Sequence, residues 1–368
     1  MGCAKRVKID NNRLKKLLRG LVDIYSPSGK EVEILEYAEQ CLVSSGMNVM
    51  RQEVDEARYN LIVSPEGITP EILFLGHLDT VPAFDLEKFE SCQRKDEIFG
   101  LGAADMKGGC AAMIEAFISF YEKNDSLPPA VLALVVGEEE EGDGTKQLID
   151  DLRIPWAIVG EPTNMEVCLS HYGYIEVEFR TFGKRRHASY SDYQHNAIFD
   201  MLQILLRVTA WLDKSRHHVI YNIRDVHSAD SGFAVPDRCI ALLDMHFPPG
   251  SRLKTVARSI ERIIAAQGEL GVGYKHIVDF PTVNRGYKIP DKGKMVRLIR
   301  KSFENRGFSW EPGSFRSHSD ANILWEAGTK PVILGPGHLA KAHSNNESVP
   351  LKQVFLAAEV YLEILEAL

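Results

Sequence analysis

The sequence predicts an α/β protein into which a second, α+β domain is inserted. Three short apolar runs, at residues 72–75, 130–136 and 155–159, have the length and composition of buried strands. Segments with helical periodicity separate these runs, which is typical of a sheet with parallel strands. At 368 residues the chain is also too long for one ordinary hydrophobic core. We therefore expect two domains.

The first part of the chain is expected to alternate helices and strands. Asn11 is a suitable N-cap for the first helix, and Pro27-Ser28-Gly29 separates it from the second. An Ala-rich helix is expected to follow the glycine-rich stretch at residues 100–109. The elements predicted in this part are helices at 11–25, 30–44 and 110–121, and strands at 47–52, 59–63, 72–75, 130–136 and 155–159.

The pattern changes at about Gly173 to the order β-α-β-β-α-β, which is the ferredoxin-like split motif. After about Arg285 the earlier alternation of helices and strands resumes. We therefore expect one domain formed by residues 1–172 and 286–368, and an inserted domain at 173–285. The elements predicted from 173 onwards are strands at 174–182, 219–224, 239–247, 272–280 and 331–334, and helices at 196–212, 253–267, 292–304, 320–326 and 351–368.

Composition excludes several classes of function. A net charge of −8 and a pI of about 5.9 argue against a nucleic-acid or anionic-membrane partner. The six cysteines are scattered without a CxxC pair, which favours free thiols in a reducing compartment. The N-terminus has no apolar signal-peptide region, and no apolar run is long enough to span a bilayer. A cytoplasmic protein is expected.

The stretch Gly76-His77-Leu78-Asp79 follows the first buried strand. His77 and Asp79 are two residues apart, so on a strand they point the same way. They also stand at a carboxyl end, where α/β sheets usually place ligands. Two interpretations stay open at this point: a metal-binding His with its carboxylate partner, or a structural pair at the end of a strand.

Acidic residues or histidines also follow the other predicted strands. Asp105 lies in the glycine-rich stretch, where it could equally cap the next helix, and the run Glu138–Glu141 could equally be a solvated turn. A set of nitrogen and oxygen ligands without cysteine suits Zn²⁺, or else Mn²⁺ or Co²⁺. Two ions fit if one carboxylate bridges them, since paired ions lie roughly 3.5–4 Å apart. The ligand candidates are His77, Asp105, one residue of Glu138–Glu141, Glu161 and His343.

Six motifs in order resemble the M20 metallopeptidase family, which includes acetylornithine deacetylase, succinyl-diaminopimelate desuccinylase and carboxypeptidase G. They are GHLDTVP, GLGAADMKGG, GEEEEGDGT, VGEPT, GKRRHAS and AHSNNE. The resemblance implies a mixed-sheet zinc-peptidase catalytic domain of the phosphorylase/hydrolase-like type, with the ferredoxin-like insert as its lid.

The resemblance also implies roles for individual residues. Asp105 would bridge two divalent ions, Zn²⁺ before Co²⁺ or Mn²⁺. His77 and Glu161 would hold one ion, and His343 and a Glu the other. Asp79 would orient His77, and His187 of the lid would stabilise the oxyanion, unless it is only a surface His. Within the run of four Glu, Glu138 is expected as general base and Glu139 as ligand; the alternative is a shift by one, to Glu139 and Glu140.

The implied reaction is hydrolysis of an amide by a hydroxide that bridges the two ions. Glu138 would take the proton from water and return it to the leaving amine. The substrate would be a small amino acid that carries an acetyl or succinyl group. A dipeptidase or carboxypeptidase with the same residues is the alternative, and a non-catalytic binding protein on this fold is a remote one. The family's lid often dimerises, so a homodimer through the lid is expected, with a monomer as the alternative.

One departure from the family concerns the substrate's carboxylate. Many members carry an Arg in an Asp-x-Arg stretch, where it can pair bidentately with a carboxylate. Here that stretch reads Asp244-Met245-His246. Arg316 is our first hypothetical replacement and Arg186 the second, although surface ion pairs would explain both equally well.

Overall fold

The computed structural model describes residues 8–83, 89–191, 195–214, 218–228, 232–266 and 275–368. The chain forms two compact units. The first consists of Met1–Leu169, Ile289–Phe315 and Ser319–Leu368, and the second of Ser170–Lys288 with Arg316–His318. The inserted domain expected at 173–285 falls inside the second unit, and the short segment 316–318 joins it from much later in the chain.

The first unit is built on a mixed sheet whose four central strands are parallel. β3 pairs in parallel with both β6 and β7, and β7 pairs in parallel with β16. Antiparallel strands flank this centre on both sides. Along the sheet the strands are β1 (Met50–Glu53), β2 (Tyr59–Val63), β6 (Ala130–Val135), β3 (Ile72–His77), β7 (Trp156–Val159), β16 (Lys330–Ile333), β8 (Cys168–His171) and β14 (Tyr287–Lys288), with β15 (Gly313–Phe315) against β8.

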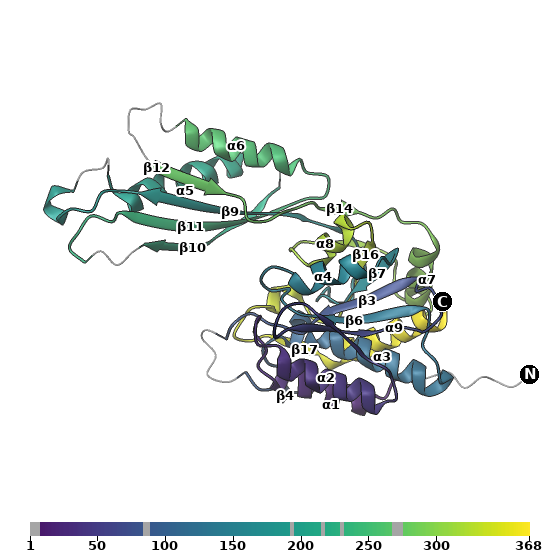
Figure 1. The fold of residues 1–368 in the computed structure, drawn as a ribbon. Coiled ribbons are helices and arrows are strands. Elements are labelled where there is room, and N and C mark those ends of the chain that lie inside the picture. The colour runs from purple at the N-terminus through teal and green to yellow at the C-terminus, as the bar shows by residue number, and fades with distance from the viewer. Residues whose placement is uncertain (1–7, 84–88, 192–194, 215–217, 229–231, 267–274) are drawn as a thin grey trace, which may run out of the picture. The chain divides into compact units, whose positions relative to one another are not determined.

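Helices pack around this sheet because its central strands are apolar on both faces; every residue of β3 and of β6 is buried. In Figure 1, α1 and α3 lie below β3 and β6, whereas α4 and α8 lie above them. Phe74 of β3 meets Phe117 of α3 and Tyr361 of α9 edge to face, at centroid distances of 5.5 and 5.6 Å. The helices are α1 (Asn11–Asp23), α2 (Val32–Ser44), α3 (Gly108–Asn124), α4 (Asp143–Asp151), α7 (Lys294–Glu304), α8 (Asp320–Glu326) and α9 (Leu351–Glu366).

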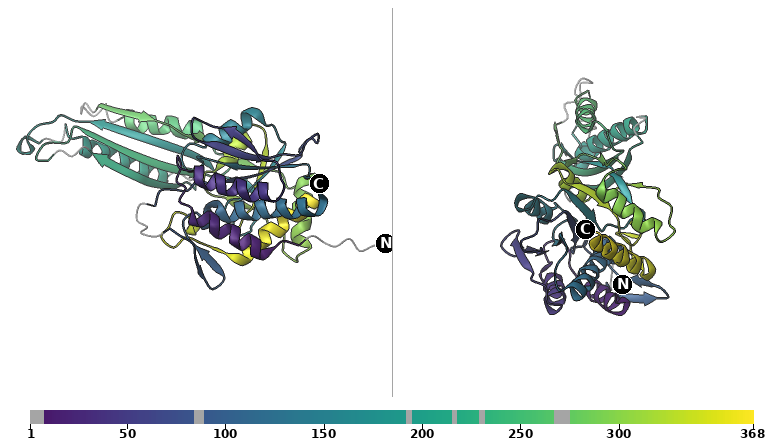
Figure 2. Two further views of the ribbon diagram at one scale, coloured as in Figure 1. Left: turned by 60° about the horizontal axis from the view of Figure 1, so that its bottom comes forward. Right: turned by 90° about the vertical axis from the view of Figure 1, so that its right-hand side faces the viewer.

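The second unit has its own antiparallel sheet and its own core. The strand order is β10-β11-β9-β12, and the elements follow one another as β9-α5-β10-β11-α6-β12. The right-hand view of Figure 2 shows both helices on the same side of this sheet, where they cover a cluster of buried apolar side chains. The elements are β9 (Gly173–Phe182), α5 (Ala197–Lys214), β10 (Ile220–Ser228), β11 (Arg238–Phe247), α6 (Leu253–Ala265), β12 (Lys275–Asp279), β13 (Val283–Asn284) and β14 (Tyr287–Lys288).

Several elements were not expected from the sequence. β4 (Cys92–Arg94), β5 (Glu97–Phe99) and β17 (Ser348–Pro350) form a small third sheet, and β8 was also missed. These strands are only three or four residues long, so they carry little periodicity. Of the predicted segments 253–267 and 272–280, residue 267 and residues 272–274 lie outside the described residues.

Two further expectations concern free cysteines and membrane-spanning segments. The five cysteines among the described residues are free, and Cys3 lies outside them. Among the same residues, every helix is too short or too polar to cross a membrane.

Candidate metal centre

The candidate ligands gather where the parallel strands end. His77 is the last residue of β3, Glu138 and Glu139 follow β6, and Glu161 follows β7. His343 lies on the segment between β16 and β17. The carboxyl ends of parallel strands meet at one edge of a sheet, which is why residues far apart in the sequence come together here.

Asp105 reaches the same place on a tight turn before α3. Gly102 has a left-handed backbone, with φ of 74°, which a glycine adopts at no steric cost. The start of α3 then passes very close to the end of β7: a Cβ atom on Gly109 would lie 2.2 Å from the carbonyl oxygen of Gly160. Glycine at 109 therefore allows the turn to bring Asp105 beside Glu161.

The ligand candidates form two groups that share Asp105. In one group, Nε2 of His77 lies 3.4 Å from Oδ1 of Asp105 and 3.9 Å from Oε1 of Glu161. In the other, Nε2 of His343 lies 3.5 Å from Oδ2 of Asp105 and 3.1 Å from Oε2 of Glu139. The two carboxylate oxygens of Asp105 thus face different histidines, as a bridging ligand requires.

The contacts of His77 suit a metal ligand. Its Nδ1 lies 3.0 Å from the carbonyl oxygen of Asp79, so a proton on Nδ1 leaves the lone pair of Nε2 pointing at the carboxylates. Nε2 is buried and makes no hydrogen bond among the described residues. A tetrahedral ion with bonds of about 2.0–2.1 Å holds its ligand atoms about 3.4 Å apart. The spacing and the unpartnered nitrogen therefore fit a divalent cation.

The electrostatics of the site also favour a cation. Burial disfavours a charged imidazole, but Asp105, Asp79 and Glu138 outweigh it and raise the pKa of His77 well above its usual value. His343 is likewise opposed by burial, yet Glu139 and Asp105 raise its pKa to about 9. Burial and neighbouring carboxylates raise the pKa of Glu161 well above its usual range. Crowded buried carboxylates of this kind are relieved when a metal ion supplies positive charge.

The four glutamates after β6 differ in their surroundings. Glu139 belongs to the group with His343, and Oε2 of Glu138 lies 3.8 Å from Nε2 of His77. Glu140 and Glu141 are exposed. Burial, followed by the charges of Asp320 and Glu139, raises the pKa of Glu138 well above its usual value. A carboxyl group with a raised pKa can both take up and release a proton near neutral pH.

Asp79 contacts the loop that carries Glu138 and Glu139 as well as His77. Its carboxylate accepts hydrogen bonds from the backbone N–H groups of Glu138 and Glu139, at 3.2 and 3.0 Å. The hydroxyl of Ser28 donates to it at 2.7 Å. Its distance to Nδ1 of His77 is longer, at 3.6 Å. The backbone carbonyl of Asp79 thus lies nearer to His77 than its carboxylate does, and the carboxylate binds the backbone of Glu138 and Glu139.

Three residues singled out from the sequence lie in the second unit. His187 is exposed, and its Nδ1 lies 2.8 Å from the hydroxyl of Ser189. Arg186 is half-buried, and its carbonyl oxygen accepts a hydrogen bond from Val235. Arg316 is exposed. Their roles in binding or catalysis stay predictions.

Two residues that touch this site were missed from the sequence. Ser28 stood only in a predicted turn, and no pattern linked it to Asp79. Glu347 is the last residue of the AHSNNE motif, and its buried carboxylate accepts hydrogen bonds from the loop that carries Asp105. Its place four residues after His343 was the one available signal.

Comparison with known proteins gives a family match and relatives that match 82–98% of the chain. The model of Peptidase family M20/M25/M40 matches residues 73–367. A [LysW]-lysine/[LysW]-ornithine hydrolase of Sulfurisphaera tokodaii is 25% identical and covers 98% of this chain and 97% of its own. A probable carboxypeptidase of Aspergillus terreus is 27% identical over 95% and 85% of the two chains. A succinyl-diaminopimelate desuccinylase of Coxiella burnetii is 24% identical over 82% and 84%.

A solved structure shares the fold over the whole chain. The structure of a tripeptidase from Staphylococcus aureus superposes with a TM-score of 0.81 and 23% identity, covering 98% of both chains.

Proposed function

The chain belongs to peptidase family M20/M25/M40, a family of metal-dependent hydrolases that act on amide bonds, and we propose that its substrate is a small N-acylated amino acid. An acetyl or succinyl group is the acyl part that it removes. Relatives that match 82% and 98% of the chain support this proposal, because they are a desuccinylase and a hydrolase named for lysine and ornithine.

The observation that carries the proposal is the position of Asp105 between two histidines. Its Oδ1 and Oδ2 lie 3.4 and 3.5 Å from Nε2 of His77 and of His343. This arrangement supports two divalent ions, with Glu161 completing one group and Glu139 the other. The nitrogen and oxygen donors favour Zn²⁺, with Co²⁺ and Mn²⁺ as alternatives.

When bound, the ions polarise the amide carbonyl and lower the pKa of water. Glu138 accepts a proton from the attacking water and then donates it to the leaving amine nitrogen, so Glu138 ends the reaction in the protonation state in which it began. This register, with Glu138 as base and Glu139 as ligand, is supported by the exposure of Glu140, which the alternative register needs as a ligand. His187 donates a hydrogen bond to the oxyanion that forms on the substrate's carbonyl.

Two arginines of the second unit are proposed as anchors for the substrate's carboxylate. Arg316, an exposed residue, is the first candidate. Arg186 is the second. A bidentate pair with a carboxylate would select amino-acid substrates over simple amides.

A dipeptidase or carboxypeptidase is the second candidate function, favoured by the relatives named as carboxypeptidases. The test is a hydrolysis screen of protein that has been stripped with a chelator and reloaded with Zn²⁺, Mn²⁺ or Co²⁺. N-acetylornithine, N-acetyllysine and N-succinyl-diaminopimelate are compared with a set of dipeptides. Metal-dependent cleavage of an acylated amino acid supports the proposal. Cleavage of dipeptides alone would replace it with the peptidase function.

A homodimer through the second unit is also proposed. β10 ends the sheet order of that unit, and it exposes Ile220, Ile223 and Val226, each at 39–47%. An apolar edge strand is a surface on which a second copy can pair. Light scattering should give twice the chain mass, and Ile223→Lys should give the single mass.

A further inference from the structure

The carboxylate of Glu347 accepts three backbone hydrogen bonds from the loop that carries Asp105. Oε2 accepts the N–H of Gly102 at 2.9 Å, and Oε1 accepts those of Ala104 and Asp105 at 2.9 and 3.0 Å. The loop makes a turn that is neither regular helix nor strand, so these buried N–H groups need a partner from outside it. Glu347 is that partner, and it touches the backbone of Asp105 without reaching either group of ligand atoms.

Glu347 also fixes the loop that carries His343, a ligand candidate of one group. Its own N–H donates to the carbonyl of Ser344 at 3.1 Å, which closes the turn directly after His343. Its carbonyl accepts from Gly100 at 3.2 Å, at the point where β17 begins to pair with β5. Glu347 therefore joins the segment after His343 to the segment before Asp105 through hydrogen bonds of both its own backbone and its own side chain.

Resting on the proposed function, we propose that Glu347 is a positioning residue that sets the distance between His343 and Asp105, and so the affinity of the metal site formed by Asp105, Glu139 and His343. The other site depends on it less, because His77 and Glu161 stand at the ends of β3 and β7, which the sheet holds in place.

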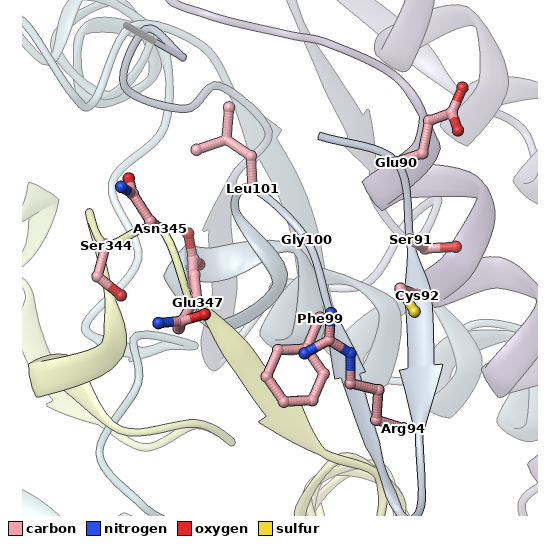
Figure 3. Close-up of a pocket in the computed structure, with 11 residues that line it drawn as sticks. Glu90, Ser91, Cys92, Arg94, Phe99, Gly100, Leu101, Ser344, Asn345 and Glu347 are labelled. Carbon is pink, nitrogen blue, oxygen red and sulfur yellow. The ribbon is translucent and has the colours of Figure 1, made fainter. Parts of the chain in front are cut away.

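A glutamine at position 347 would keep the shape of the side chain but would lose one acceptor. Its NH₂ group would face a backbone N–H of the loop, and two donors cannot pair. The loop has room to shift, because Glu347, Ser344 and Asn345 line a cavity of about 310 Å³ together with Gly100 and Leu101 (Figure 3). We therefore expect a displaced loop in a folded protein.

The test is a titration of metal-free protein with Co²⁺, followed through the visible absorbance of the bound ion, in the parent and in Glu347→Gln. The binding step that His343→Ala removes identifies the site in question. We expect Glu347→Gln to weaken this step by roughly 10–100-fold, the range typical for residues that orient metal ligands, and to weaken the other step less. Glu97→Gln is the matched control, because this neighbouring carboxylate pairs with Lys341 and Ser348 but not with the Asp105 loop.

Two outcomes would overturn this inference: unchanged affinity for both ions in Glu347→Gln, or equal weakening of both steps. If Glu347→Gln does not fold, Glu347→Asp gives the same readout, since the shorter side chain withdraws the same acceptors. Failure of the parent protein to bind two ions would instead overturn the proposed function, so the two failures are distinguishable.

Discussion

Replacing Glu138 by Gln should abolish most of the activity while leaving the metal site intact. The carboxylate of Glu138 lies 3.8 Å from Nε2 of His77, but it belongs to neither group of closely spaced ligand atoms. Gln keeps the size of the side chain, and the backbone N–H at this position would still donate to Asp79. The change therefore removes the proton acceptor and little else.

The expected loss follows from the role of a general base. Such a group contributes typically 10²–10⁴-fold to the rate, which corresponds to about 3–5 kcal/mol in the activation free energy. Burial and the charges of Asp320 and Glu139 raise the pKa of Glu138, so the parent residue can return the proton to the amine. A carboxamide can neither accept the proton from water nor return it to the amine. KM should change little, because ground-state binding of the substrate does not use this proton.

The assay is kcat on the substrate that the hydrolysis screen identifies, together with the metal content of each variant by elemental analysis. Glu140→Gln is the control: this side chain is exposed, and its loss should change neither quantity. Glu139→Gln should lower metal content, because Glu139 stands with His343 and Asp105. A Glu138→Gln variant that kept its kcat within about tenfold of the parent would refute the assignment. Loss of metal in Glu140→Gln would instead support the register shifted by one.

Three further predictions concern Asp79, Arg316 and His343. Asp79→Asn should lower activity by roughly 10–100-fold in a folded protein, since it removes one acceptor from the backbone N–H groups of the glutamate loop; parental kcat would contradict this. Arg316→Ala should raise KM by roughly 10–100-fold at constant kcat, because a hydrogen bond to a charged group is worth about 1.5–3 kcal/mol. Arg258→Ala, at an exposed position of α6, should leave KM unchanged; equal KM values in the two variants would refute the anchor. In metal-free protein, His343 has a pKa raised to about 9, so its contribution to stability is complete below about pH 6.5 and is lost as the pH rises to 9. The Tm of chelated protein should fall across that range, and the fall should be smaller in His343→Gln; an equal fall in both proteins would exclude this source.

The residues at strand ends were the part of the site that the sequence predicts best. His77, Glu161 and the glutamates each follow an apolar run, and the parallel arrangement of β3, β6 and β7 brings such positions to one edge. Family resemblance supplied the pairing of these residues into two groups. Asp105 needed that help, because an Asp before a helix is as often a cap as a ligand.

Contacts that end on backbone groups could not be predicted in this way. The carboxylates of Asp79 and Glu347 accept hydrogen bonds from backbone N–H groups of the ligand loops, and Ser28 donates to Asp79. Almost every residue type has a backbone N–H, so the sequence does not show which of these groups will be bound. The small sheet of β4, β5 and β17 was missed for a related reason: it joins residues about 250 positions apart through strands of three residues. That sheet is what brings Glu347 to the loop of Asp105.

We propose that one chain binds two divalent ions through Asp105. The most direct measurement is the number of Zn²⁺ ions per chain, by elemental analysis of protein loaded with Zn²⁺ and freed of excess metal, in the parent and in Asp105→Ala. We expect two ions in the parent and the loss of both in Asp105→Ala, because both groups share this carboxylate. A single ion in the parent, or two ions retained without Asp105, would contradict it.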